Sequence, residues 1–205
     1  MFTGIVQGTG IVVKLNTLHN LTQVGITVLP SLSQNIQKGA SVSIDGVCLT
    51  VVRQEDNTLY FDIVAETLNC TTFRNLYINQ VVNIERALKM GDELGGHLLS
   101  GHVMGIASVT LIEKPTPEQS KLFFTWPEKW MCYIIPKGFI AINGVSLTVV
   151  DTDPSGIFSV HLIPETLATT NLSALKVTAA VNIEIDYQTQ VLVQTVQRFL
   201  ATQKI

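Results

Sequence analysis

Short apolar runs separated by turn signals recur along the whole chain, and this pattern predicts strands. In the first half the runs lie at 4–13, 23–29, 40–44, 47–53, 59–64 and 81–86. In the second half they lie at 102–112, 121–124, 139–142, 145–151, 157–162 and 181–185. Asp45-Gly46 and Asn143-Gly144 each separate two runs, and such dipeptides form tight hairpin turns. About six strands per half, joined by hairpins, predict a small closed antiparallel barrel, since closure removes exposed sheet edges.

The two sets of strands are copies of one unit. The segment 45–52, DGVCLTVV, returns 98 residues later at 143–150 as NGVSLTVV. The segments 66–68 and 82–85 return 99 residues later, and Gly4-Ile5-Val6 has a looser echo in Gly101-His102-Val103. Separated blocks therefore keep one order and nearly one offset. We expect an all-β chain of two tandem six-stranded antiparallel barrels, at 1–96 and 97–187, with glycines in the link at 87–96.

Three further segments do not have a strand pattern. Segments 66–73 and 165–172 each follow a strand, and four threonines there can cap a short helix or lie in a turn: Thr71, Thr72, Thr169 and Thr170. The tail at 188–203 contains neither Gly nor Pro, and one face of it carries Leu192, Val196, Phe199 and Gln203. This one-sided helix either docks on its own barrel or bundles with copies of itself and sets the oligomer.

The composition excludes several classes of partner. The net charge is −3, charged residues make up 14% of the chain, and no run of Lys or Arg exists. Neither nucleic acid nor an anionic membrane is therefore an expected partner. We expect neither a transmembrane helix nor a signal peptide. The three cysteines, an odd count without metal-type spacing, indicate reduced thiols in the cytoplasm.

Candidate chemistry lies just past each hairpin turn. Cys48 and Ser146 occupy equivalent positions, and each is followed two residues later by a threonine, Thr50 or Thr148. Because side chains alternate along a strand, each pair points to one face. Each half thus offers a thiol or hydroxyl together with a second hydroxyl, although a small polar residue after a turn can also be purely structural.

Two histidines lie in the glycine-rich stretch 95–102. The glycines around His97 and His102 allow the backbone to approach a ligand closely, and a histidine titrates near neutral pH. No third metal ligand is apparent, so we expect no metal site. One histidine is a candidate for catalysis, and a structural role is the alternative.

The two copies differ chemically at a few positions. Asp186 has Ala87 as its counterpart, and His161 has Asp62. Two domains that bind the same molecule but treat it differently would need such differences, and sequence drift is the alternative explanation.

Six blocks of the chain resemble the riboflavin synthase family (alpha chain). They are MFTGIV at 1–6, DGVCLTV at 45–51, GGHLLSGH at 95–102, KGFI at 137–140, NGVSLT at 143–148 and HLIPETL at 161–167. The resemblance extends from Met1 to about residue 188, and its motifs are specific in combination.

The resemblance implies two Greek-key barrels, an oligomerisation helix over 188–205, and three chains assembled around such helices. It implies a transferase that exchanges a four-carbon unit between two molecules of 6,7-dimethyl-8-ribityllumazine, giving riboflavin and 5-amino-6-(D-ribitylamino)uracil. Each barrel would hold one substrate, where the N-terminal barrel of one chain meets the C-terminal barrel of another. No cofactor or metal is implied. Some relatives work inside a lumazine synthase capsid, so lumazine synthase is a further candidate partner.

Site residues follow from the resemblance position by position. The implied substrate-binding residues are Gly4, Ile5, Val6, Cys48, Leu49, Thr50, Asp62, Ile63, Val64, Ala65, Glu66, Thr67, Gly101, His102, Val103, Ser146, Leu147, Thr148, His161, Leu162, Ile163, Pro164, Glu165 and Thr166, with Lys137 reaching the ligand of a neighbouring chain. Small side chains and backbone groups of this kind suit a flat heterocycle with amide-like edges.

Five residues are candidates for catalysis under this resemblance. One bound lumazine would lose a proton from its C7 methyl group, the other would be activated for attack, and the two would join in a pentacyclic adduct that splits. Cys48 and Ser146 would assist at the two half-sites, His102 and Thr148 would transfer protons, and Asp186 would polarise one of them.

Two other functions remain open at this point. Lumazine protein and related antenna proteins resemble riboflavin synthase but only bind a lumazine or a flavin. A structural barrel with a vestigial site is the third possibility. Both halves of this chain keep their site motifs, which favours the enzyme.

Overall fold

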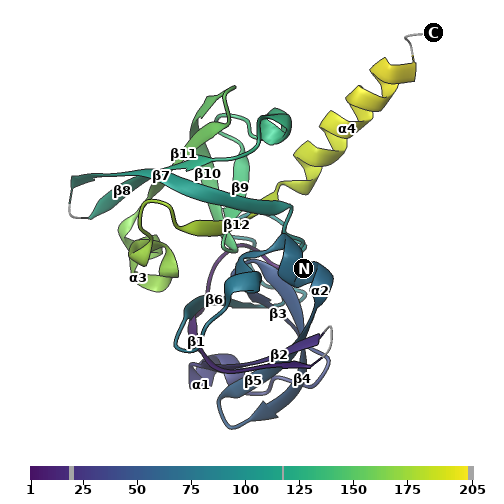
Figure 1. Ribbon diagram of the computed structural model, residues 1–205, viewed down its shortest axis with the longest axis vertical. Coiled ribbons are helices and arrows are strands. Elements are labelled where there is room, and N and C mark those ends of the chain that lie inside the picture. Colours follow the sequence, from purple (N-terminus) through teal and green to yellow (C-terminus); the bar gives the residue numbers. More distant parts are fainter. Residues whose placement is uncertain (19–20, 117, 203–205) are drawn as a thin grey trace.

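The computed structural model describes residues 1–18, 21–116 and 118–202, and each half of the chain forms a closed antiparallel barrel (Figure 1). The first barrel contains β1 (Gly8–Leu18), β2 (Leu21–Val28), β3 (Ser41–Ile44), β4 (Val47–Glu55), β5 (Thr58–Val64) and β6 (Val81–Arg86). The second contains β7 (Gly105–Thr116), β8 (Gln119–Thr125), β9 (Phe139–Ile142), β10 (Val145–Asp153), β11 (Ile157–Leu162) and β12 (Ala180–Ile185). The strand order β1-β2-β5-β4-β3-β6 returns as β7-β8-β11-β10-β9-β12. The predicted pair of six-stranded barrels is confirmed.

Short helices lie in the connections between strands. They are α1 (Pro30–Ser33), α2 (Ala65–Cys70), η1 (Thr72–Asn75), η2 (Glu128–Tyr133), α3 (Pro164–Thr169) and η3 (Asn171–Ala174), where η denotes a 3-10 helix. The segments expected at 66–73 and 165–172 each divide into an α-helix and a 3-10 helix. The Oγ1 atoms of Thr71 and Thr170 accept the N–H groups of Phe73 (3.2 Å) and Leu172 (3.3 Å), so these two threonines are caps. The sequence pattern missed α1 and η2 because helices this short carry almost no periodicity.

Alternation along the strands separates the barrel cores from the outer surfaces. On β4, Val47, Leu49 and Val51 belong to the core of the first barrel, while Cys48 is half-buried and Thr50 is exposed. β10 repeats this pattern residue by residue. The prediction that Cys48 and Thr50 share one face is therefore confirmed, and that face is the outer surface of the barrel.

The chain crosses between the barrels before each first strand. The strands expected from residues 4 and 102 begin only at Gly8 and Gly105. Ahead of them, Phe2 and Leu99 exchange two backbone hydrogen bonds of 2.9 Å each. Val6 then packs into the core of the second barrel, and Val103 packs against the core of the first. The prediction that the strands start at residues 4 and 102 was wrong. The sequence shows that these segments are apolar, but it does not show which barrel their side chains pack against.

Two buried asparagines connect the barrels. The side chain of Asn83 on β6 donates to the carbonyl of Asn143, and Asn182 on β12 donates to the carbonyl of Asp45, both at 2.9 Å. Asn83 Oδ1 accepts the backbone N–H of Asn171, the first residue of η3 in the second barrel (2.7 Å). Asn182 Oδ1 accepts the backbone N–H of Thr72, the first residue of η1 in the first barrel (2.8 Å). Each asparagine is 1% exposed, so its polar atoms need partners. The repeated motif at 82–85 and 181–184 serves this interface.

The two hairpin turns touch where the barrels meet. Asp45 and Gly46 both have positive φ (45° and 82°), as do Asn143 and Gly144 (46° and 78°). This backbone is the type I′ turn that the sequence predicted. A Cβ atom on Gly46 would lie 2.7 Å from the backbone N of Gly144, so both turns need glycine for contact as well as for conformation.

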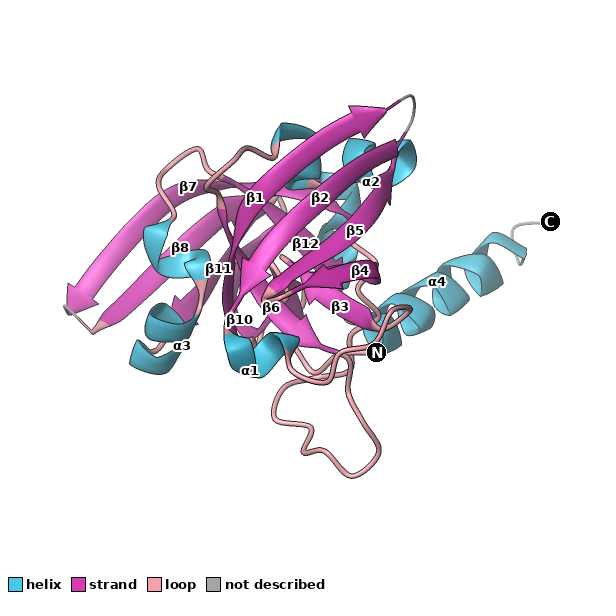
Figure 2. Ribbon diagram, turned by 90° about the horizontal axis from the view of Figure 1, so that it is seen from below, coloured by secondary structure: helices cyan, strands magenta, loops and turns pink. Residues whose placement is uncertain are grey.

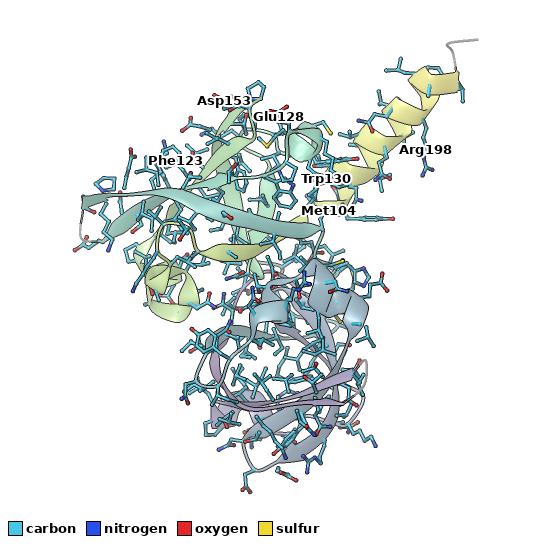
Figure 3. The ribbon with its side chains drawn as sticks, in the orientation of Figure 1. Met104, Phe123, Glu128, Trp130, Asp153 and Arg198 are labelled. Atoms are coloured by element: carbon cyan, nitrogen blue, oxygen red, sulfur yellow. The ribbon has the colours of Figure 1, made fainter. Side chains whose placement is uncertain are left out.

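The C-terminal helix α4 (Tyr187–Thr202) projects away from both barrels (Figures 1 and 2). Its tertiary contacts are mainly with η2, and Figure 3 shows Trp130 of η2 near the start of α4 and Arg198 on its free part. Leu192, Val196 and Phe199 are each more than half exposed, so α4 does not dock along its own barrel. Gln203, the last residue of the expected apolar stripe, lies outside the described residues. None of the described helices is both long enough and apolar enough to cross a bilayer.

Candidate active site

The outer surface of the first barrel carries one group of predicted site residues. β4 and β5 pair antiparallel, so the outward side chains of Cys48, Thr50 and Asp62 lie on one surface. Leu49 and Ile63 instead belong to the core. These two residues can therefore offer a ligand only their backbone groups.

The second barrel repeats this surface with different chemistry. β10 and β11 pair antiparallel, and Ser146, Thr148 and His161 have outward side chains, while Leu147 and Leu162 are core residues. A hydroxyl thus replaces the thiol, and an imidazole replaces a carboxylate. The predicted difference between Asp62 and His161 therefore lies on corresponding parts of the two surfaces.

The helices after β5 and β11 border these surfaces. Glu66 and Glu165 lie in the first turns of α2 and α3 and are exposed. The other predicted site residues at 64–67 and 163–166 are exposed or half-buried, and they extend the two surfaces. Polar and apolar side chains are therefore both exposed on each surface.

Each surface is completed by a segment from the other half of the chain. The backbone N–H of Cys48 donates to the carbonyl of Gly101 (2.9 Å), and that of Ser146 donates to the carbonyl of Gly4 (2.8 Å). The structure therefore groups 48–50, 62–67 and 101–103 in one half-site. It groups 4–6, 146–148 and 161–166 in the other. The sequence named all six segments but did not predict how they combine.

Two buried glutamates hold the crossing segments in place. Glu85 Oε1 accepts the backbone N–H and the hydroxyl of Thr3 (2.6 and 2.7 Å), and Oε2 accepts the N–H of Gly4 (3.1 Å). Glu184 accepts the equivalent three bonds from Ser100 and Gly101 (2.7, 2.7 and 3.0 Å). Burial raises the pKa of both carboxyl groups, and the hydrogen bonds oppose that rise. These glutamates orient Gly4 and Gly101 toward Ser146 and Cys48.

Two further predicted residues lie at the edges of this arrangement. Lys137 is exposed on the turn before β9, in the left-handed region (φ 70°), and its N–H donates to Val149 (2.9 Å). Asp186 caps α4, because its Oδ2 accepts the backbone N–H and the hydroxyl of Thr189 (2.9 and 2.7 Å). Asp186 also lines a pocket of about 690 Å³ together with His102.

The same pocket contains His97, one of the two candidate histidines, which the resemblance did not include among the site residues. His97 Nδ1 lies 2.7 Å from the Oγ of Ser146. Its ring stacks on Phe139, with centroids 4.9 Å apart and an interplanar angle of 13°. Burial lowers the pKa of His97, and the charge of Asp186 opposes this. The glycines beside His97 were the only sequence signal, and they did not distinguish it from His102.

Replacing Gly101 by alanine tests how the half-sites are built. Gly101 has φ +81°, and an added Cβ would lie 2.5 Å from the Cβ of Cys48, so Gly101→Ala should push the segment 101–103 off β4. We expect amide hydrogen exchange at Cys48 to accelerate about 10–100-fold, since each 1.4 kcal/mol lost from local opening is a factor of ten. The amide of Ser146 is the internal control, because its acceptor is Gly4. Equal acceleration at both amides would instead indicate global destabilisation.

The two halves also match one known domain family. The lumazine binding domain matches residues 3–87 and again residues 100–186. A riboflavin synthase of Chlamydia pneumoniae is 44% identical over 202 residues, which cover 98% of this chain and 98% of that relative. The chain belongs to the riboflavin synthase family. The riboflavin synthase of Escherichia coli (strain K12) is also 44% identical, over 204 residues that cover 100% of this chain and 95% of the relative.

Solved structures with a similar fold contain related ligands. LumP complexed with riboflavin has a TM-score of 0.84 at 33% identity, covering 90% of this chain and 99% of LumP. LumP complexed with 6,7-dimethyl-8-(1'-D-ribityl) lumazine has a TM-score of 0.81 at 32% identity, with the same coverage. The sequence identity to the riboflavin synthases is thus higher than the identity to LumP.

Proposed function

We propose that this chain is a transferase that converts two molecules of 6,7-dimethyl-8-ribityllumazine into riboflavin and 5-amino-6-(D-ribitylamino)uracil. The observation that carries this proposal is the 44% identity, over nearly the full length, to two riboflavin synthases. The duplicated half-site supports it independently. A reaction between two identical molecules needs two similar binding surfaces, and each barrel offers one.

Each half-site combines backbone groups with a small reactive side chain. In the proposed mechanism one lumazine loses a proton from its C7 methyl group, and the other accepts the resulting carbon nucleophile. Cys48 and Ser146 assist at the two half-sites, while His102 and Thr148 transfer protons and Asp186 polarises one of them. Exposed Glu66 and Glu165 accept hydrogen bonds from ribityl hydroxyls. Holding two flat molecules together supplies on the order of 7–11 kcal/mol through proximity, so single replacements should leave residual activity.

The proposed enzyme works as a homotrimer in the cytoplasm. The exposed apolar residues of α4 support helix-mediated assembly, as do the open surfaces of both half-sites. In this arrangement, 1–96 of one chain faces 97–187 of another, 188–205 form the bundle, and Lys137 reaches the neighbouring chain's ligand. Lumazine synthase is the partner to test first, by co-purification.

A binding protein without catalysis is the alternative function, and the comparisons do not favour it. LumP shares 33% identity with this chain, whereas the riboflavin synthases share 44%. Both halves here also keep the polar residues of their half-sites, including Ser146 and Thr148 in the second barrel.

Mixing the purified chain with 6,7-dimethyl-8-ribityllumazine tests the proposal directly. We expect riboflavin absorbance to grow with time, one riboflavin forming for every two lumazines consumed, and titration with riboflavin to reveal two sites per chain. A change in lumazine fluorescence without riboflavin formation would identify a binding protein instead. Saturation at one heterocycle per chain would contradict the paired half-sites.

A further inference from the structure

His97 is held in one orientation beside the second half-site. The residue is 5% exposed, and its ring stacks on Phe139 of β9. Its backbone N–H donates to the carbonyl of Thr3 (3.1 Å), which ties it to the crossing segment. Since ring and backbone are both fixed, the 2.7 Å separation of Nδ1 from Ser146 Oγ is a defined hydrogen bond.

The first half-site has no equivalent of this pair. Cys48 corresponds to Ser146, and both backbone N–H groups donate to a glycine carbonyl of a crossing segment. Within the described part of the chain, however, no hydrogen bond involves the thiol of Cys48. The imidazole therefore distinguishes two half-sites whose backbones are nearly the same.

The second ring nitrogen of His97 is buried and has no partner among the described residues. His97 and Asp186 line the same 690 Å³ pocket, and burial lowers the pKa of His97. The ring is therefore neutral at neutral pH, so one nitrogen carries a proton and the other accepts one. In the tautomer with its proton on Nε2, Nδ1 is free to accept the hydroxyl hydrogen of Ser146.

We propose that His97 is the positioning residue of the second half-site: Nδ1 accepts the hydroxyl hydrogen of Ser146, so that the Oγ lone pairs face the bound heterocycle. The inference rests on the proposed function and deepens it. The second half-site then presents a fixed acceptor oxygen, while the first presents an unassisted thiol. Two copies of one substrate are treated differently because only one of them meets this oriented oxygen.

A double-mutant cycle separates positioning from a purely structural role. His97→Ala should lower kcat about 10–100-fold with a smaller change in KM, since misplacing a contacting group by about 1 Å costs up to that much. In a Ser146→Ala background, His97→Ala should have almost no further effect on kcat, because its target is gone. The Cys48→Ala background is the matched control. In it, the fold losses of kcat caused by Cys48→Ala and by His97→Ala should multiply. His97→Asn, which keeps a short polar group near the hydroxyl, should recover part of the lost activity.

A spectroscopic experiment tests the same inference without turnover. In ¹⁵N NMR of the full-length protein, Ser146→Ala should shift the Nδ1 resonance of His97, whereas Cys48→Ala should not. If the wild type makes no riboflavin, the proposed function fails while this experiment still decides the hydrogen bond. The inference is overturned if His97→Ala keeps wild-type kcat, if its effect multiplies with Ser146→Ala, or if Ser146→Ala leaves the Nδ1 resonance unchanged.

Discussion

Gly46→Ala should lower the free energy of unfolding by about 2–5 kcal/mol, much more than Gly39→Ala. Both glycines have positive φ (82° and 91°), so both replacements carry the strain of a left-handed residue, about 1–2 kcal/mol. A Cβ at position 46 would also lie 2.7 Å from the backbone N of Gly144, whereas nothing lies within 4 Å of one at position 39. Overpacking of this kind costs about 1–3 kcal/mol more.

Chemical denaturation of both variants measures the difference directly. Gly39→Ala is the matched control because it keeps the conformational strain and omits the contact between the two hairpin turns. Gly144→Ala should behave like Gly46→Ala, since the contact is reciprocal. Equal losses in Gly46→Ala and Gly39→Ala would show that the close approach of the two turns adds no cost to a Cβ atom at position 46.

Asp45→Asn should stabilise the protein at neutral and alkaline pH. Asp45 is fully buried at the interface between the barrels, and burial raises its pKa from 3.8 to about 7. Its Oδ1 accepts the N–H of Asn83 (2.7 Å) and the side-chain amide of Asn171 (2.9 Å). An asparagine can keep both bonds without a charge, and the equivalent position in the second half is Asn143, whose Oδ1 accepts the N–H of Asn182 (2.8 Å).

The sign of the effect follows from proton binding. Between pH 3.8 and about 7 the folded protein keeps the Asp45 proton, while the unfolded chain has lost it. The stability that the buried, protonated Asp45 contributes is therefore fully present below pH 3.8, and it is lost as pH rises through about 7. A shift of this size corresponds to at most about 4 kcal/mol, because one pKa unit equals about 1.4 kcal/mol.

Denaturation curves at several pH values compare the wild type with Asp45→Asn. The stability gap should widen from pH 4 to pH 7 and then stay constant. Asn143→Asp is the complementary variant. Its new buried carboxyl group should cause a second loss of stability as the pH rises. A gap that does not change with pH would mean that Asp45 is ionised in the folded protein throughout this range.

Local sequence patterns predicted most of the secondary structure. Strands β6, β9 and β11 have the bounds that the sequence predicted, because runs of apolar residues and turn dipeptides are local signals. The same alternation placed Cys48 and Thr50 on one outer surface. Short helices such as α1 and η2 were missed, since one or two turns leave no periodic pattern.

The composition of the half-sites required contacts that no local pattern contains. Gly4 and Ser146 are far apart in sequence, yet the carbonyl of one accepts the N–H of the other. Glu85 appears in the sequence only as part of a repeated strand, and the structure shows that it holds Thr3 and Gly4. These bonds join residues that only the tertiary fold brings together.

The sequence by itself determined that the chain contains two copies of one β-rich unit, that each copy carries a similar set of motifs, and that the copies differ at positions such as His161. These properties are encoded in residue order and alternation. Only the tertiary structure decided that each half-site borrows a segment from the other half, that His97 lies beside Ser146, and that Asp45 is a buried acid. The reason is physical: hydrogen-bond partners and burial depend on which surfaces meet in space.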